Sequence, residues 1–181
     1  MYYVPMYQYP YCVPLCTCGR QPMNYYLQMN QQGNMLSPIR SRHIEIKDYG
    51  KQPFVVNINE AAKMNNTFRT ALWTGEHLQV TLMSLDVGED IGLEVHPNVD
   101  QFLRIEDGEG FVQMGPTRDN LNFERSVQDD DAIMVPAGTW HNVTNTGNKP
   151  LKLYTIYAPP NHPFGTVQQT KADAMAAEEH H

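Results

Sequence analysis

The chain from residue 78 onward is dominated by short stretches in which apolar and polar residues alternate. Leu78, Val80 and Leu82, for example, are separated by Gln79 and Thr81. Because successive side chains of a strand point to opposite faces, this period of two predicts strands with one buried face. We expect further strands at residues 94–96, 101–105, 111–114, 132–135, 140–145 and 151–157. Turn-forming Gly, Pro, Asn and Asp separate these stretches, so the pattern predicts an all-β sandwich or barrel.

Two short helices are predicted on either side of the strands. Asn57 is a capping residue followed by good helix formers up to Met64, and residues 171–179 predict a second helix. We expect His180 and His181 to belong to a solvated terminus. The chain then divides into an arm (1–39), a linking segment with the first helix (40–74), a barrel (75–160) and a tail with the second helix (161–181).

The arm differs sharply in composition from the rest of the chain. Residues 1–39 hold one charged side chain, Arg20, but seven of the ten Tyr, five of the thirteen Pro and all three Cys. Frequent Pro excludes a regular helix, so we expect a low-complexity, poorly ordered arm. Cys12, Cys16 and Cys18 fit neither a paired disulfide framework nor a structural zinc site. They are either idle reduced thiols, or part of an arm that self-associates by cross-linking or binds soft metals.

Charge and hydropathy exclude several classes of partner. The 181 residues carry 13 Lys and Arg against 20 Asp and Glu, a formal net charge of −7. This balance disfavours nucleic acid and anionic membrane surfaces, which are bound by clusters of cationic side chains. The sequence contains neither an apolar stretch of about 20 residues nor an N-terminal secretion signal. We therefore expect a cytoplasmic protein.

Two segments carry the side chains best suited to chemistry. In the first, Glu94 and His96 share one face if residues 94–96 form a strand, since side chains repeat every two residues. In the second, the turn Pro136-Ala137-Gly138 delivers His141 at the start of a strand. Two imidazoles, one carboxylate and one amide oxygen from these two segments and the residues that follow them can therefore converge.

The first segment resembles the first motif of the cupin superfamily, G-x5-H-x-H-x3/4-E-x6-G. The matching positions in this chain are Gly88, Glu94, His96, Gln101 and Gly108. Two of them depart from the family pattern, because Glu94 replaces the first His and Gln101 replaces the Glu.

The second segment resembles the second cupin motif, G-x5-P-x-G-x2-H-x3-N. Its positions are Asp130, Pro136, Gly138, His141 and Asn145, of which Asp130 replaces the opening Gly. The resemblance covers residues 75–158 and implies a cupin jelly roll, a small antiparallel β-barrel that is commonly dimeric. The whole chain is similar to small single-domain cupins of spore-forming bacteria, some of which are labelled mannose-6-phosphate isomerase-like.

The resemblance also implies a metal inside the barrel. By position the ligand set is Glu94, His96, Gln101 and His141. Two imidazoles with a carboxylate and an amide oxygen suit divalent Zn, Mn, Fe, Co or Ni. If the protein is an enzyme, we expect a metal-dependent isomerase or dioxygenase, with Glu94 as a ligand or, when not bound to metal, as the general base. Non-catalytic cupins that lack metal are the competing interpretation.

Strand parity predicts what surrounds this site. With Gln101 and His141 inward, Leu103, Ile105, Val143 and Asn145 also point inward, a mostly apolar lining suited to a small organic ligand such as a carbohydrate. Phe102 and Trp140 then face outward and are expected in sheet packing or a homodimer interface. Arg104 also faces outward, leaving Arg118 and Arg125, expected in loops, as cations for a sugar phosphate. His43, His77 and His162 are expected to be surface or structural residues.

A second class of function is structural. The composition of the arm resembles that of proteins in the coats of bacterial endospores. In this alternative the barrel is a folded anchor and the arm drives assembly, which would place the protein in the spore coat.

Overall fold

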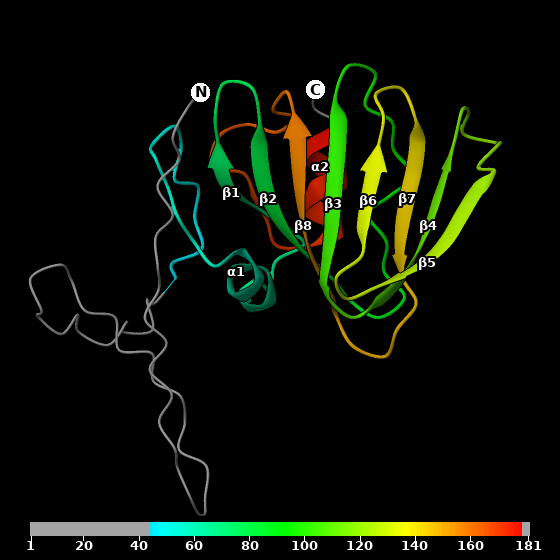
Figure 1. Cartoon of the computed structure of the whole chain (residues 1–181), viewed down its shortest axis with the longest axis horizontal. Helices are drawn as coiled ribbons and strands as arrows, with labels where there is room; N and C mark the ends of the chain where they lie inside the picture. The colour runs from blue at the N-terminus through cyan, green and yellow to red at the C-terminus, as the bar shows by residue number, and fades with distance from the viewer. Residues whose placement is uncertain (1–43, 179–181) are drawn as a thin grey trace, which may run out of the picture. The chain divides into compact units, whose positions relative to one another are not determined.

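A computed structural model describes residues 44–178 of the chain (Figure 1). The predicted arm, His43 and the terminal His180 and His181 lie outside these residues. The described part contains two helices, α1 (Ile58–Met64) and α2 (Lys171–Glu178). Its strands are β1 (Arg69–Thr74), β2 (Gln79–Leu85), β3 (Asp100–Asp107), β4 (Glu109–Gly115), β5 (Phe123–Gln128), β6 (Ala132–Val135), β7 (Trp140–Asn145), β8 (Leu151–Ala158) and β9 (Val167–Gln168).

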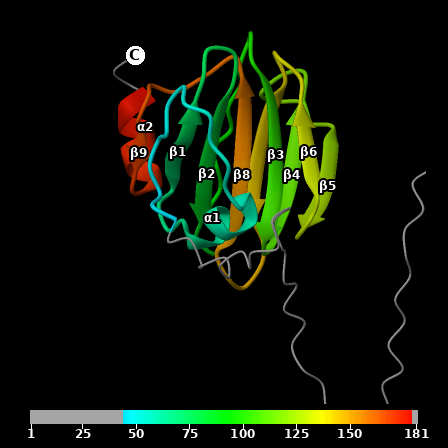
Figure 2. The same cartoon turned by 60° about the vertical axis from the view of Figure 1, so that its left-hand side comes forward.

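The strands form two antiparallel sheets. The larger has the order β6-β3-β8-β2-β1-β9, and the smaller has the order β5-β4-β7. Figure 2 shows the strands of the larger sheet next to one another, with α1 in front of β2 and β8 and α2 beside β9. Gln101 of β3 pairs with both Tyr157 of β8 and Val135 of β6, so these three side chains point to the same face. The fold is the all-β jelly roll that the sequence predicts.

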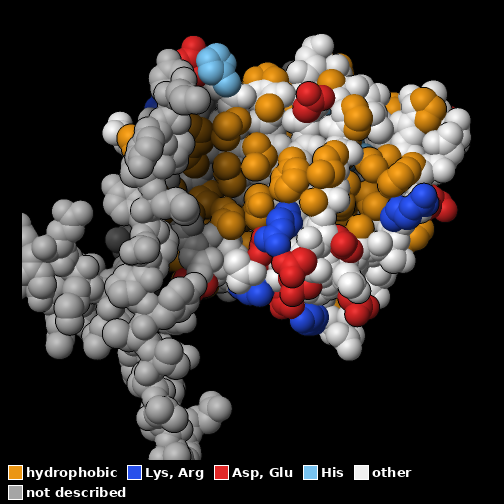
Figure 3. All heavy atoms as spheres, viewed as in Figure 1, with side chains coloured by type: hydrophobic (Ala, Val, Ile, Leu, Met, Phe, Trp, Pro, Cys, Tyr) orange, Lys and Arg blue, Asp and Glu red, His pale blue; other side chains and the backbone are white. Residues whose placement is uncertain are grey.

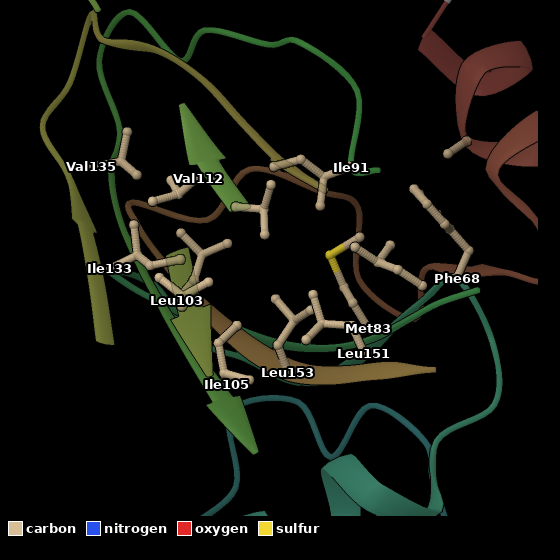
Figure 4. Packing of buried hydrophobic residues seen from close by; sticks show 14 residues of the cluster. Phe68, Met83, Ile91, Leu103, Ile105, Val112, Ile133, Val135, Leu151 and Leu153 are labelled. Atoms are coloured by element: carbon tan, nitrogen blue, oxygen red, sulfur yellow. The ribbon is translucent and has the colours of Figure 1, made fainter. Parts of the chain in front are cut away.

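The main core fills the space between the sheets. Leu103, Ile105, Leu153 and Val143 are fully buried there, and Val112 of the smaller sheet meets them (Figure 4). Leu103, Ile105 and Val143 are inward positions that strand parity predicts for β3 and β7. Full burial of each such side chain contributes roughly 1.5–3 kcal/mol. The apolar packing fixes the strand register, which in turn fixes the polar residues further along the same strands.

A second apolar cluster lies on the outer face of the larger sheet. Ala61 and Ala62 of α1 pack there against Leu72 and Leu82. The helix begins where predicted, because the side chain of Asn57 accepts a hydrogen bond from the backbone N–H of Glu60. The helix and the segment before it cover one part of this face and leave the rest to solvent.

Most predicted elements match the structure. The strands expected at 132–135 and 140–145 coincide with β6 and β7, and four others are shifted or extended by a few residues. Residues 94–96 are the exception, because Glu94 forms only an isolated bridge to His141. The pattern did not predict β1, β5 or β9, and β1 and β9 extend the barrel sheet beyond residues 75–160. No helix within residues 44–178 is long and apolar enough to cross a membrane.

Candidate metal centre

Backbone hydrogen bonds hold the two motif segments side by side. The N–H of Glu94 donates to the carbonyl of His141 over 3.1 Å, and the N–H of His141 donates back over 2.9 Å. Two residues further on, the carbonyl of His96 accepts from the N–H of Gly138 over 2.9 Å. Gly138 has φ 78°, a conformation that glycine adopts without strain. The turn before β7 and the segment before β3 therefore form one rigid unit.

This unit brings one carboxylate and two imidazoles together. Glu94 Oε1 lies 3.2 Å from His96 Nε2 and 3.4 Å from His141 Nε2. The three candidate ligand atoms all lie within 4.8 Å of one another. The side chain of His141 is completely buried, while those of His96 and Glu94 keep 13% and 16% exposure. The cluster is thus sheltered but reachable from outside.

The hydrogen bond of His141 to the turn sets which ring nitrogen faces the cluster. Nδ1 lies 3.0 Å from the carbonyl oxygen of Thr139, which can only accept, so Nδ1 carries a hydrogen. In the neutral ring, Nε2 then presents a lone pair toward the Glu94 carboxylate, and this buried atom has no hydrogen-bond partner. Two acceptors that face each other at this distance repel unless a cation or a proton lies between them. The donor set therefore fits a divalent metal ion.

The electrostatics keep the carboxylate ionised. Burial raises the pKa of Glu94, but hydrogen bonds from His141 and His96 when their Nε2 atoms carry a proton, together with the charge of Arg69, outweigh it and hold the pKa well below its ordinary value. Glu94 is accordingly an anion at neutral pH and a competent metal ligand.

Gln101 occupies the neighbouring wall of the barrel. Its side chain points inward from β3 and is almost fully buried, and its Nε2 donates to Thr155 Oγ1 over 3.1 Å. Its Oε1 has no hydrogen-bond partner. The residue opposite Gln101 is Tyr157, whose ring packs edge-on against His96 with centroids 5.6 Å apart. The amide oxygen of Gln101 is therefore unpartnered on the strand beside Tyr157, which contacts His96, while the amide nitrogen is held by Thr155.

Sequence reasoning missed a group of polar side chains in the barrel. Arg69 of β1 is 1% exposed, and its Nη1 donates to Gln168 Oε1 over 2.8 Å. The Tyr157 ring lies edge-on to His162 at 5.0 Å, and burial raises the pKa of Tyr157 to about 12. Burial also lowers the pKa of His162 to about 3, so this residue is a neutral structural histidine. Arg69 could not be placed because β1 was not predicted.

Other candidate residues lie away from the cluster. Arg104 points outward and pairs with Glu106 and Asp130, as strand parity predicts for its face. Arg118 is exposed in the turn after β4. The expectation that Arg125 lies in a loop is wrong, because it belongs to β5 and stacks over the Phe123 ring.

The remaining predictions concern outward-facing residues and two histidines. Phe102 and Trp140 are half-buried, and the Phe102 ring packs near Tyr154 on the outer face of the sheet. The side chain of His77 is 88% exposed, which agrees with a surface role. Asn145 points inward and has a structural task, since its amide donates to the carbonyls of Leu85, Asp86 and Lys149.

Comparison with known proteins agrees with this geometry. The family model of the cupin domain matches residues 81–157, which run from β2 to β8 and include all four candidate ligands. The protein YrkC of Bacillus subtilis is 62% identical over 186 residues, covering 99% of this chain and 100% of YrkC. The chain belongs to the cupin family. A single cupin domain thus accounts for the strands that surround the candidate metal centre.

Solved structures place this cupin among related folds. The crystal structure of BH2720 from Bacillus halodurans is 68% identical to this cupin, with a TM-score of 0.72, and the match covers 72% of this chain and 99% of that chain. A protein from Klebsiella pneumoniae with a double-stranded β-helix domain has a TM-score of 0.51 at 18% identity, covering 65% of this chain and 98% of that chain. The second likeness concerns the fold alone.

Proposed function

We propose that this cupin binds a divalent transition metal through Glu94, His96 and His141, with the amide oxygen of Gln101 as a fourth ligand. The observation that supports the proposal is the convergence of three ligand atoms within 4.8 Å, one of them the unpartnered Nε2 of buried His141. Borderline ligands of this kind suit Zn, Mn, Fe, Co or Ni. One carboxylate against a divalent ion leaves the centre with a net positive charge, so it attracts an oxygen-bearing ligand.

The role of the centre is to hold a small organic ligand in the barrel. A bound metal would supply Lewis acidity toward a carbonyl or hydroxyl oxygen, the chemistry that metal-dependent isomerases use, and a dioxygenase would in addition require Fe or Mn with two open coordination positions. The apolar inward residues beside the cluster, such as Leu103 and Val135, exclude water from that ligand. Glu94 acts as a metal ligand in this proposal, and as a proton acceptor only where the metal does not hold it.

Elemental analysis of the untagged full-length chain tests the proposal. The protein is stripped with chelator, reconstituted separately with each of the five metals, and desalted. We expect about one equivalent in the wild type and loss of that metal in His96→Ala and in His141→Ala. The matched control is His77→Ala, which removes an exposed histidine.

A second control addresses metal bound elsewhere in the chain. A variant with Cys12, Cys16 and Cys18 replaced by Ser should keep the full equivalent, because none of the proposed ligands is changed. If the wild type takes up no stoichiometric metal, or if His141→Ala retains it, the proposal is wrong.

We also propose that two copies of the chain associate through the outer face of the larger sheet. Hydrophobic side chains gather over this face in Figure 3, and a hollow of about 400 Å³ there is lined by Phe102, Met134, Pro136 and Ile156. Met134 is 64% exposed. An exposed apolar surface of this kind suits a symmetric dimer, in which the same patch of both copies is buried. In sedimentation equilibrium we expect a dimer that Met134→Asp converts to a monomer, and a monomeric wild type would contradict this.

A further inference from the structure

The barrel interior contains an unusual set of buried polar atoms without hydrogen-bond partners. Within the part of the chain that the structure describes, seven such side-chain atoms occur, and six belong to residues in or beside the interior. They are Arg69 Nε, Thr81 Oγ1, Gln101 Oε1, His141 Nε2, Tyr157 OH and His162 Nε2. Native proteins leave few buried polar groups unpaired, so a concentration of them indicates free hydrogen-bonding capacity toward a polar ligand, an ion or water. Only two of the six belong to the proposed metal ligands.

The strand register explains why four of these groups share the interior. Arg69 lies opposite Met83, which belongs to the main core, so its side chain also enters the barrel. Thr81 lies opposite Thr155, two residues before Tyr157 on the same face of β8. His162 packs edge-on against Tyr157. Arg69, Thr81 and Tyr157 therefore face the interior from β1, β2 and β8, and His162 of the loop after β8 lies beside Tyr157.

Arg69 is the charged member of this group. It is 1% exposed, and among the ion pairs found in residues 44–178 none includes it. Its guanidinium donates to the neutral side-chain oxygen of Gln168 and lies over the Phe68 ring at 5.4 Å, and neither partner carries a negative charge. A buried guanidinium without a paired anion is costly, and its planar fork of N–H groups matches a carboxylate in two parallel hydrogen bonds. The charge of Arg69 also helps to hold the pKa of Glu94 below its ordinary value, so the guanidinium acts electrostatically on the proposed metal centre.

We propose that Arg69 selects a carboxylate as the ligand of this barrel. The inference rests on the proposed metal function, because the carboxylate would lie between Arg69 and the metal centre. The hydroxyls of Tyr157 and Thr81 offer further donors to its oxygens. A divalent metal, Arg69 and Glu94 together carry a net charge of about +2, which an anionic ligand offsets and a neutral one leaves unbalanced. Arg69 is a specificity residue in this proposal and takes no part in bond making.

The test compares an anion with its neutral counterpart. The full-length protein loaded with Co²⁺ is titrated with pyruvate and with hydroxyacetone, which differ in carboxylate against hydroxymethyl. Binding is followed by calorimetry and by the visible absorption of Co²⁺. In the wild type we expect pyruvate to bind at least about 10-fold more tightly than hydroxyacetone, the ratio that charge-assisted hydrogen bonds provide. Inorganic phosphate is titrated alongside as the competing anion.

Variants identify the side chain responsible. Arg69→Met should weaken pyruvate binding at least about 10-fold and leave hydroxyacetone binding within about 2-fold, with the Co²⁺ content unchanged. Arg118→Met is the matched control, because it removes an exposed arginine that lies outside the barrel. Arg69→Gln is prepared in parallel, since it can keep a hydrogen bond to Gln168. Cooperative unfolding in urea shows which of the two neutral variants is folded, and pyruvate binding by either folded variant tests the proposal.

Each contrary outcome has a distinct meaning. Equal pyruvate binding in the wild type and a folded Arg69 variant overturns the carboxylate proposal, as does tighter binding of phosphate than of pyruvate. If the protein takes up no Co²⁺, the metal function fails instead. The same pyruvate titrations of metal-free wild type and variant then decide the role of Arg69, because its charge does not depend on the metal.

Discussion

The carboxylate of Glu94 faces Nε2 of His141 across 3.4 Å, while the backbones of the two residues exchange both of their hydrogen bonds. A cation bound between the side chains therefore links the segment before β3 to the start of β7. A metal that binds the folded chain and not the unfolded one would stabilise the fold.

The first prediction concerns this stabilisation. Free Co²⁺ at 100 times its dissociation constant should raise the free energy of unfolding by about 2.7 kcal/mol. Urea unfolding with and without the metal measures the shift. The shift should vanish in His141→Ala and persist in His77→Ala, whose side chain is exposed. A stabilisation that survives in His141→Ala would show that the metal binds elsewhere.

The second prediction concerns Gln101, whose Oε1 is buried and unpartnered. Gln101→Glu places a second carboxylate in the barrel, so divalent metal should bind at least about 10-fold more tightly. Without metal the added buried charge near Glu94 should lower the free energy of unfolding by about 1–3 kcal/mol at pH 7. Competition with a chelator and urea unfolding measure the two effects.

Gln101→Met is the matched control for that prediction. It keeps the approximate volume of the side chain and removes the amide oxygen, so it should weaken metal binding. If both variants bind metal as the wild type does, Gln101 is not a ligand.

The third prediction tests whether Asn145 stabilises the fold without binding the metal. Asn145 is buried, and its amide donates to three backbone carbonyls in the loops at one end of the barrel. Asn145→Asp keeps the shape but replaces the donors with a carboxylate, so we expect a loss of about 3 kcal/mol in the free energy of unfolding. Metal stoichiometry in the folded fraction should stay at the wild-type value. A loss of metal without a loss of stability would reverse this assignment.

The fourth prediction is a pH dependence caused by His162. Burial lowers its pKa from 6.5 to about 3, so the folded state keeps the ring neutral while the unfolded state takes up a proton below pH 6.5. Stability is therefore lost as the pH falls from 6.5 toward 3, by up to about 1.4 kcal/mol per pH unit from this side chain. His162→Phe should show a shallower decline in urea unfolding between pH 7 and 4. Parallel curves for variant and wild type would contradict the prediction.

The sequence predicted the strands whose two faces differ in polarity. β7 alternates half-buried and buried residues along its length, and its limits were predicted correctly. β1 is buried at its first four positions, because α1 covers Leu72 on one face while Arg69 enters the barrel on the other, so no period of two appears. β5 exposes nearly all of its side chains, and β9 has two residues. A two-residue period of apolar and polar side chains is visible in a sequence only where buried and exposed positions alternate along the strand.

The site was predictable only as far as motif spacing reaches. The cupin spacing predicted Glu94, His96 and His141 as ligands, and the structure brings these three together. It did not predict that the Thr139 carbonyl sets the tautomer of His141, since that depends on the turn geometry. The contact between Tyr157 and His162 likewise depends on how β8 and the loop after it pack.

The hydrogen bond from Arg69 to Gln168 joins residues 99 positions apart in the sequence and ties β1 to a strand of two residues. That short strand is the last β-structure of the described chain, and it forms the edge of the sheet next to the guanidinium. The C-terminal segment therefore positions the guanidinium of Arg69 as well as continuing the barrel sheet. A truncation or fusion that displaces residues 167–168 would remove this hydrogen bond, so it would change the position of the side chain to which we assign ligand selection.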